Sequence, residues 1–306
     1  MKKLPVVYLA GSGHTGSTLL ALFLDAHPRI VSVGETAFKR KLQGSRGAAL
    51  TCTCGAPYSE CEFWQKIFRG VTAAGYDFSP EQWSNDFRYK GWLAHRLFSR
   101  YSARPALRLA QTAAGALLPR HRARVERVRR VNVEFIRAVL RTADADVFFD
   151  TSKRAMRLHQ LLQTPELDVK VIKLVRDVRG YASSAKRRGG AVPEAALTWR
   201  KDQENLDRIT RDLPAARVML LRYEDVCRDP RTWLKRAYAF CGVDPIEPPD
   251  FVVSREHHVL GNSMRRNDSI RIRFDESWRT SLTVDEQKRA IAIAGPFHAR
   301  NGYSLT

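Results

Sequence analysis

Short apolar runs along this chain predict its first strands and helices. The run from Leu4 to Ala10 predicts a buried strand, and the leucine-rich stretch after it predicts a helix from Ser17 to about Ala26. Pro28 cannot continue that helix, and residues 31–35 then read as a short second strand that delivers a carboxylate. The chain therefore begins with a strand, a loop, a helix and a strand.

Three further apolar runs predict later strands, at residues 147–153, 169–175 and 218–225. Strands that alternate with helices form mostly parallel sheets covered on both faces, so the expected class is α/β. Residues 70–145 interrupt this alternation, and we expect a helical insertion there. With 306 residues, 44% of them hydrophobic, the chain can bury a large core. We expect one domain over residues 1–306.

The loop before the first helix has the residues of a phosphate-binding loop. Residues 11–18 read Gly-Ser-Gly-His-Thr-Gly-Ser-Thr, which has Walker A spacing but places Ser17 where the lysine belongs. Backbone N–H groups and the helix dipole converge on an anion in such a loop. A transferring phosphoryl group needs a metal and a cation together. A cradle without the cation suits a less charged group, such as a sulfuryl group, and no metal.

A second candidate element follows the strand at 169–175. Arg176 lies at the carboxyl end of that strand, and Ser184 lies eight residues further on, in the next helix. Ligands of open α/β sheets bind outside the carboxyl ends of strands. A guanidinium and a hydroxyl at this spacing can therefore hold one phosphate, although a surface ion pair between Arg176 and Asp177 is the alternative.

Residues 4–36 and 169–188 together resemble the sulfotransferase superfamily that uses 3′-phosphoadenosine-5′-phosphosulfate (PAPS). The Leu-Asp-Ala-His-Pro segment at 24–28 and the Gly-Glu pair at 34–35 are most similar to bacterial and tyrosylprotein sulfotransferases. The resemblance implies a P-loop-type fold, PAPS as donor, adenosine 3′,5′-bisphosphate as product and no required metal. It implies nucleotide contacts from Gly13, His14, Thr15, Gly16, Ser17 and Thr18, and a 3′-phosphate held by Arg176 and Ser184.

Three weaker matches follow in the family's order. Residues 150–153 resemble its Asp-x-Ser-Lys element, residues 222–225 its Arg-Tyr-Glu-Asp segment, and residues 258–265 its late Gly-Asn loop. The further nucleotide contacts implied by the last two are Tyr223, Asn262 and Arg265.

The resemblance also implies three catalytic candidates. Glu35 matches the general base of the tyrosylprotein enzymes; a capping or salt-bridged carboxylate is the alternative. Lys153 is the expected cation on the sulfuryl group or leaving oxygen, unless it faces solvent. His14 departs from the family, which usually has Arg or Lys there. Imidazole titrates near neutrality, so His14 can donate a proton, accept one or simply hydrogen-bond the nucleotide.

Three of the five cysteines, Cys52, Cys54 and Cys61, fall in one short loop. A structural zinc site takes four ligands, usually with two-residue gaps, so three thiols at this spacing fall short. The Cys-x-Cys-Gly and Cys-x-Phe-Trp pattern is similar to a loop in bacterial sulfotransferases. A disulfide, a metal and plain packing all stay open, and no metal is assigned.

A net charge of +20 is also typical of nucleic-acid-binding proteins. Arginines crowd an expected helix, at positions Arg120, Arg122, Arg124, Arg127, Arg129, Arg130, Arg137 and Arg141. They point to different sides of a helix, and no DNA or RNA motif accompanies them. A solvated helix, a docking surface for an acidic acceptor or anionic membrane, and nucleic acid are the explanations that compete.

The apolar run after Met1 is too short for a signal peptide, and no run reaches the ~20 residues that a spanning helix needs. We expect a cytoplasmic protein, although the amphipathic stretch 105–118 can lie on a membrane surface.

The acceptor is a hydroxyl of a sugar, a peptide tyrosine, a lipid or a small alcohol or phenol, and we place its binding helices in residues 70–145. The rival functions are a P-loop kinase of a small molecule, with Asp150 as its metal-binding carboxylate, and a basic nucleic-acid-binding protein. Nothing in the sequence indicates the oligomeric state.

Overall fold

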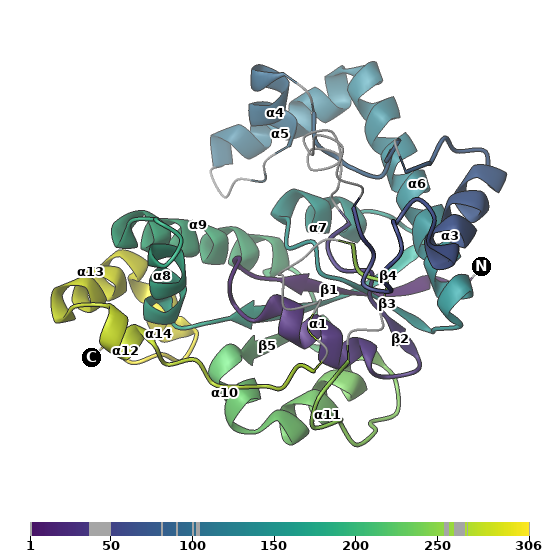
Figure 1. The fold of residues 1–306 in the computed structure, drawn as a ribbon. Helices are drawn as coiled ribbons and strands as arrows, with labels where there is room; N and C mark the ends of the chain where they lie inside the picture. Colours follow the sequence, from purple (N-terminus) through teal and green to yellow (C-terminus); the bar gives the residue numbers. More distant parts are fainter. Residues whose placement is uncertain are drawn as a thin grey trace.

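The computed structural model describes most of the chain (Figure 1). The described residues are 2–36, 50–80, 82–89, 91–99, 101, 105–253, 257–259, 267 and 269–305.

A five-stranded parallel sheet forms the centre of the described structure, in the order β2-β3-β1-β4-β5. Its strands are β1 (Leu4–Ala10), β2 (Ile30–Val31), β3 (Val147–Asp150), β4 (Leu167–Val175) and β5 (Val218–Arg222). Because all strands run the same way, the ends of β1, β3 and β4 lie on one edge, where ligands of such sheets bind. The predicted α/β class is confirmed.

The described helices cover both faces and one end of the sheet (Figure 1). They are α1 (Ser17–Asp25), α3 (Glu62–Ala73), α4 (Trp92–Phe98), α5 (Pro105–Leu117), α6 (Pro119–Ala143), α7 (Ala155–Leu162), α8 (Val178–Lys186), α9 (Val192–Thr210), α10 (Tyr223–Arg228), α11 (Pro230–Cys241), α12 (Trp278–Ser281), α13 (Val284–Ala294) and α14 (Pro296–Arg300), with a 3₁₀ turn at Ala215–Arg217.

Alternation along β1 divides the core into two layers. Val6 and Tyr8 point to one face and pack with residues of α3, α6 and α7. Val7 and Leu9 point to the other face and pack with α1 and α11. Since successive side chains of a strand point to opposite faces, an apolar run of this kind is the expected pattern for a strand buried on both sides.

The second strand is shorter than the sequence predicts. It covers Ile30 and Val31 alone and not residues 31–35, because only these two positions pair with β3. The chain then leaves the sheet: the Ser32 N–H donates to the Asp25 carboxylate instead of to a strand. Glu35 therefore lies four residues beyond β2 rather than at its end.

The expected helical insertion is present. Between residues 62 and 143, the described part of the chain contains α3, α4, α5 and α6 and no strand. Helix α6 packs against both α3 and α5, and its inner side reaches β3.

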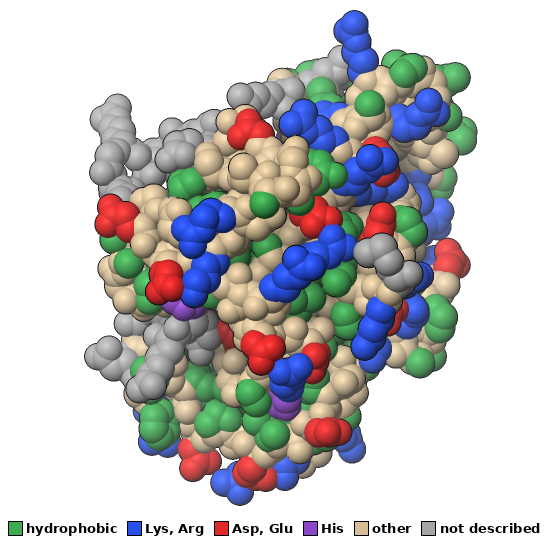
Figure 2. Space-filling view, turned by 90° about the vertical axis from the view of Figure 1, so that its right-hand side faces the viewer, with side chains coloured by type: hydrophobic (Ala, Val, Ile, Leu, Met, Phe, Trp, Pro, Cys, Tyr) green, Lys and Arg blue, Asp and Glu red, His purple; other side chains and the backbone are tan. Residues whose placement is uncertain are grey.

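The arginines of α6 do not form a single stripe. Arg129 donates to Gln160 and Gln163, whereas Arg130 pairs with Glu126. Figure 2 shows Lys and Arg side chains gathered over the upper part of one face, where α5 and α6 lie, with acidic side chains interspersed below.

Among the described helices, none has the length and apolar character to cross a membrane.

Candidate functional site

The loop between β1 and α1 has the backbone of an anion cradle. Gly16 caps α1 at a φ of 85°, and a Cβ at this position would lie 2.7 Å from the Tyr223 ring. Both facts require glycine here. Thr15 closes the turn by donating its hydroxyl to the carbonyl of Ser12 at 2.9 Å. Gly13 at the loop's tip has open space around it, so the loop's outer side is free to take a ligand.

Lys153 connects the loop to Glu35. Its Nζ lies 2.9 Å from Ser17 Oγ and 3.1 Å from Glu35 Oε1, and its side chain is only 14% exposed. The structure thus brings together the loop serine, the cation predicted to replace the missing lysine, and the candidate base. Lys153 does not face solvent.

Two hydrogen bonds hold these groups in register. The Thr36 N–H donates to Ser152 Oγ at 3.1 Å, and the two hydroxyls of these residues lie 2.8 Å apart. Thr36 follows Glu35 and Ser152 precedes Lys153, so the ion pair is supported on both sides by buried contacts.

Lys153 and His14 both have left-handed backbones, with φ values of 57° and 62°. Such conformations cost non-glycine residues free energy and cluster at binding sites. In this protein both strained residues lie beside the same loop, which is consistent with a site whose geometry is imposed by the surrounding fold.

Arg176 is nearly buried at the end of β4. Its guanidinium donates to the Asp275 carboxylate at 3.0 Å and to the Asp275 carbonyl at 2.9 Å. It also contacts the His14 carbonyl at 3.3 Å and lies 4.5 Å from the centre of the Tyr223 ring. The alternative, an ion pair of Arg176 with Asp177, is not what the structure has: Asp177 pairs with Arg179, and Arg176 pairs with Asp275.

Ser184 lies in α8, on the same face as Gly180. Helix α8 starts at Val178, and a Cβ at Gly180 would lie 2.8 Å from Arg176 Nε. Residues 180 and 184 are one turn apart on the same face. The buried Ser184 therefore lies on the face of α8 that carries Gly180, next to the Arg176 guanidinium.

Tyr223 has a structural position under the loop. Its hydroxyl donates to the Arg273 carbonyl and accepts from the Asp275 N–H, both at 3.1 Å. The ring packs against Gly16 and Arg176, and the hydroxyl is hydrogen-bonded to backbone groups.

His14 faces a cationic environment. The Arg188 guanidinium contacts its ring, and the ring centroid of Tyr181 lies 6.5 Å away. Burial lowers the pKa of His14, and Arg188, Lys153 and Arg176 lower it further against the opposing effect of Glu35. The imidazole is therefore neutral at pH 7 in the free protein. Two other predicted contacts, Asn262 and Arg265, lie outside the described residues.

Asp150 does not have an open carboxylate. One oxygen accepts from Arg157 Nε at 2.7 Å, and the other accepts from the Ser152 N–H at 3.0 Å. The side chain is completely buried. This carboxylate orients the chain that leads to Lys153.

Two residues that contact the site, Arg188 and Asp275, were not predicted from the sequence. Arg188 belongs to a short basic run after α8, which has the composition of any exposed turn. Asp275 comes from a region without a recognisable motif. Only the folded chain brings these residues to His14 and Arg176.

A profile described as "Sulfotransferase family" matches residues 76–248, which is more than half of the chain. The chain belongs to the sulfotransferase family. Curated relatives include human carbohydrate sulfotransferase 3, 31% identical over 180 residues, and the mouse protein of the same name, 29% identical over 179 residues. Each alignment covers 48% of this chain and 36% of the relative. The chain thus matches about a third of the relatives' length.

Solved structures of low identity share the fold of this sulfotransferase family member. The sulfotransferase domain from the curacin biosynthetic pathway has a TM-score of 0.55 at 18% identity, with 100% of both chains covered. The sulfotransferase domain of the Synechococcus PCC 7002 olefin synthase has a TM-score of 0.51, also at 18% identity, with 100% of this chain and 98% of that chain covered.

Proposed function

We propose that this protein transfers a sulfuryl group from PAPS to a hydroxyl of an acidic carbohydrate. The position of Lys153 carries the proposal, because its ammonium group lies between Ser17 in the anion cradle and Glu35. The same ammonium group thereby contacts the loop, where a donor phosphate would bind, and Glu35, which would deprotonate a hydroxyl. Membership of the sulfotransferase family makes PAPS the expected donor.

The donor would be held at two places. The backbone of residues 11–16 and the amino end of α1 suit the 5′-phosphosulfate, because consecutive N–H groups favour an anion there. Arg176 and Ser184 suit the 3′-phosphate. Asp275 holds Arg176 in place in the free protein. PAPS supplies the activated sulfuryl group.

The chain's own residues then move one proton and stabilise charge. Glu35 takes the proton of the acceptor hydroxyl as the oxygen attacks sulfur. Lys153 and the loop N–H groups stabilise the negative charge that develops on the transferring group and on the leaving oxygen. His14 is a neutral hydrogen-bonding residue in this scheme, since its pKa is lowered. No step needs a metal.

The acceptor class follows from two cavities in the helical insertion. One, of about 260 Å³, is lined by Arg154, which directly follows Lys153 in the chain, and by Arg157. The other, of about 300 Å³, shares Phe87 and Met156 with the first. The two cavities therefore lie next to each other and run from Arg154, the residue after Lys153, to α5 and α6 of the insertion.

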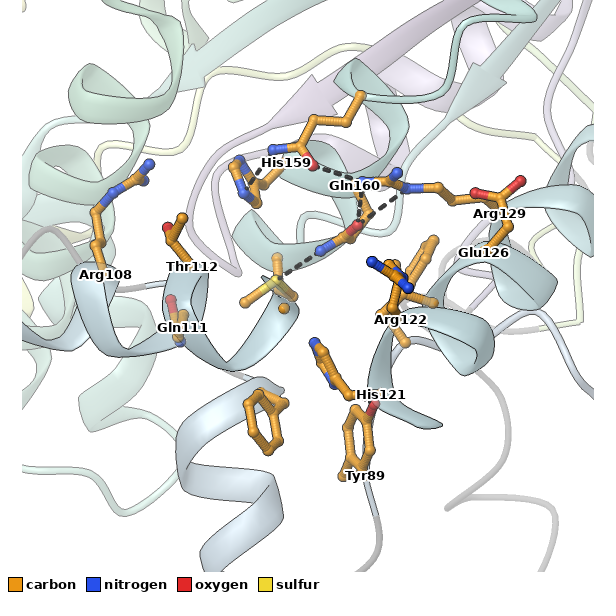
Figure 3. A pocket seen from close by; sticks show the side chains of 16 residues that line it. Tyr89, Arg108, Gln111, Thr112, His121, Arg122, Glu126, Arg129, His159 and Gln160 are labelled. Carbon is orange, nitrogen blue, oxygen red and sulfur yellow. Dashed lines mark hydrogen bonds between the residues drawn. The ribbon is translucent and has the colours of Figure 1, made fainter. Parts of the chain in front are cut away.

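The second cavity is basic. Figure 3 shows Arg108 from α5 and Arg122 and Arg129 from α6 around it, with Glu126 as the acidic side chain of its lining. His159 contributes no charge, because burial, with help from Arg108 and Arg129, lowers its pKa to about 4. A cavity with this charge favours an anionic acceptor, and the relatives' name, carbohydrate sulfotransferase, points to a sugar.

A small-molecule kinase is less well supported. It needs a free carboxylate to hold Mg²⁺ near the loop, whereas Asp150 is used by Arg157 and Ser152. A nucleic-acid-binding function is also less well supported, because the arginines of α6 are distributed between Gln160, Glu126 and other partners rather than presented as one stripe.

The test is transfer of labelled sulfate from PAPS to a panel of neutral and acidic oligosaccharides. We expect labelled product, with acidic sugars preferred over neutral ones, and equal activity with and without added Mg²⁺. Mg²⁺-dependent transfer from ATP, with none from PAPS, would contradict the proposal.

A further inference from the structure

Four potential metal ligands from two distant segments meet beside α3. They are Cys52, Cys54, Cys61 and His257, and their ligand atoms all lie within 4.8 Å of one another. Cys54 Sγ is 3.6 Å from Cys61 Sγ. His257 Nδ1 is 3.5 Å from Cys52 Sγ and 3.2 Å from Cys61 Sγ. The three thiols of the sequence motif thus gain the fourth ligand that they lack in the sequence.

The spacing of these atoms matches a tetrahedral zinc site. Zinc binds cysteine sulfur at about 2.3 Å and histidine nitrogen at about 2.0–2.1 Å, so tetrahedral geometry separates two sulfurs by roughly 3.8 Å and a sulfur from a nitrogen by roughly 3.5 Å. The Cys54–Cys61 sulfur separation of 3.6 Å and the two separations of His257 Nδ1 from sulfur, 3.5 and 3.2 Å, lie close to these values, and the other ligand atoms lie within 4.8 Å. We propose that Cys52, Cys54, Cys61 and His257 bind one zinc ion in a closed structural site.

The backbone of the cysteine loop presents its thiols in a manner suited to a metal. The Gly55 N–H donates to the Cys52 carbonyl at 3.0 Å, with Gly55 at a φ of 93°, and the Cys52 N–H donates to the Ala56 carbonyl at 2.9 Å. This tight turn lets Cys52 and Cys54 reach one point despite a gap of one residue. Cys61 is the N-cap residue of α3, so the helix fixes the position of its backbone.

The imidazole of His257 is oriented by its neighbours. Its ring stacks on Phe63 with centroids 4.3 Å apart and planes inclined by 6°. Its carbonyl accepts from Trp64 Nε1 at 3.0 Å. These contacts direct Nδ1 towards the thiols, as the residues surrounding a metal site do for histidine ligands.

Hydrogen bonds join the two segments independently of the four ligands. The Thr53 N–H donates to the His258 carbonyl at 3.0 Å, and the His258 N–H donates to Thr53 Oγ1 at 3.0 Å. The ligand set is therefore preorganised, which lowers the cost of forming the site. On binding, the metal would replace the thiol protons, which pass to solvent.

The position of the cluster gives the metal a structural role near the transfer site. His258 Nε2 lies 2.9 Å from the Ser32 carbonyl and 3.5 Å from Asp25. Ser32 begins the segment that leads to Glu35. With four protein ligands, zinc would have no open position for a substrate. It would anchor residues 257–259 and the cysteine loop against the chain that carries the candidate base.

The test is the metal content of the full chain, purified under reducing conditions from cells supplied with zinc, and it needs no sulfotransferase assay. We expect about one zinc ion per chain by inductively coupled plasma mass spectrometry. Cys54→Ser and His257→Asn should each lower zinc affinity at least ~10-fold. Cys227→Ser, which changes a thiol outside the cluster, should keep the full zinc content.

Cobalt substitution of the wild-type chain provides a second measurement that does not depend on variants folding. Tetrahedral Co²⁺ with thiolate ligands should give a strong charge-transfer band in the near ultraviolet. A wild-type chain without zinc and without this cobalt band would overturn the proposal. So would full zinc affinity in His257→Asn, or a disulfide between Cys54 and Cys61 in place of the metal.

Discussion

Replacing Lys153 by alanine tests the proposed transfer chemistry most sharply. The substitution removes the ammonium group that contacts Ser17 and Glu35. Alanine keeps the Cβ, so the left-handed backbone at this position costs a similar free energy in the variant and in the wild type. We expect turnover to fall on the order of 10² to 10³, as when one preorganised donor is removed elsewhere. Affinity for adenosine 3′,5′-bisphosphate should change much less.

The magnitude follows from the burial of this lysine. Two unit charges ~4 Å apart interact by about 4 kcal/mol at the effective dielectric constant of a partly buried site. Lys153 already attracts the charge of the bound donor, which accounts for part of these ~4 kcal/mol. Roughly 3 kcal/mol then stabilises the additional charge that develops in the transition state. About 1.4 kcal/mol corresponds to a factor of ten in rate, so 3 kcal/mol is a little over 10².

The assay is steady-state transfer of labelled sulfate to the best acceptor from the panel, with circular dichroism to check folding. Lys235→Ala is the matched control, because it removes the same charge from the surface of α11, where the half-exposed Lys235 pairs with Glu247. That variant should keep wild-type turnover. Equal turnover in Lys153→Ala and Lys235→Ala would refute the role given to Lys153.

Three further predictions follow from the same geometry. Glu35→Gln should lower turnover by ~10² to 10⁴, and a normal rate with a hydroxyl acceptor would exclude a base there. Arg176→Ala should raise the Kd of adenosine 3′,5′-bisphosphate by ~10 to 10², measured by calorimetry; unchanged binding would remove it from the 3′-phosphate site. Burial raises the pKa of Asp177, but hydrogen bonds from His298 and Arg179 outweigh it and lower the pKa to about 2. The free energy of unfolding should therefore fall by about 2 kcal/mol as pH drops from about 4 to 2, and chemical denaturation should show a smaller fall in Asp177→Asn.

Much of the fold was predictable because its strands are buried on both faces. The run at 4–10 has the predicted bounds, whereas the third strand begins at the predicted Val147 and ends at Asp150, short of the predicted 153. The loop and helix between 11 and 25 follow from glycine and leucine patterns alone. The second strand was placed too far along the chain. An edge strand of two residues carries too weak a signal, and the contact of Ser32 with Asp25 that ends it is tertiary.

The candidate site was partly predictable for a related reason. The loop follows β1, Glu35 follows β2 by four residues and Lys153 follows β3 by three. Parallel topology brings the segments that leave these strands to one edge of the sheet. Arg188 and Asp275 could not be predicted, because their contacts with His14 and Arg176 depend on how α8 and the region around 275 pack. His257 was missed as well, since it lies almost two hundred residues beyond the cysteine loop and does not belong to a sequence motif of metal ligands.

Calorimetric titration with adenosine 3′,5′-bisphosphate, in buffer without divalent metal, tests the central claim most directly. Our account predicts one binding site per chain, weakened in Arg176→Ala and unaffected by Mg²⁺. Absence of binding by the folded wild-type chain, or binding of ATP with Mg²⁺ in its place, would contradict it.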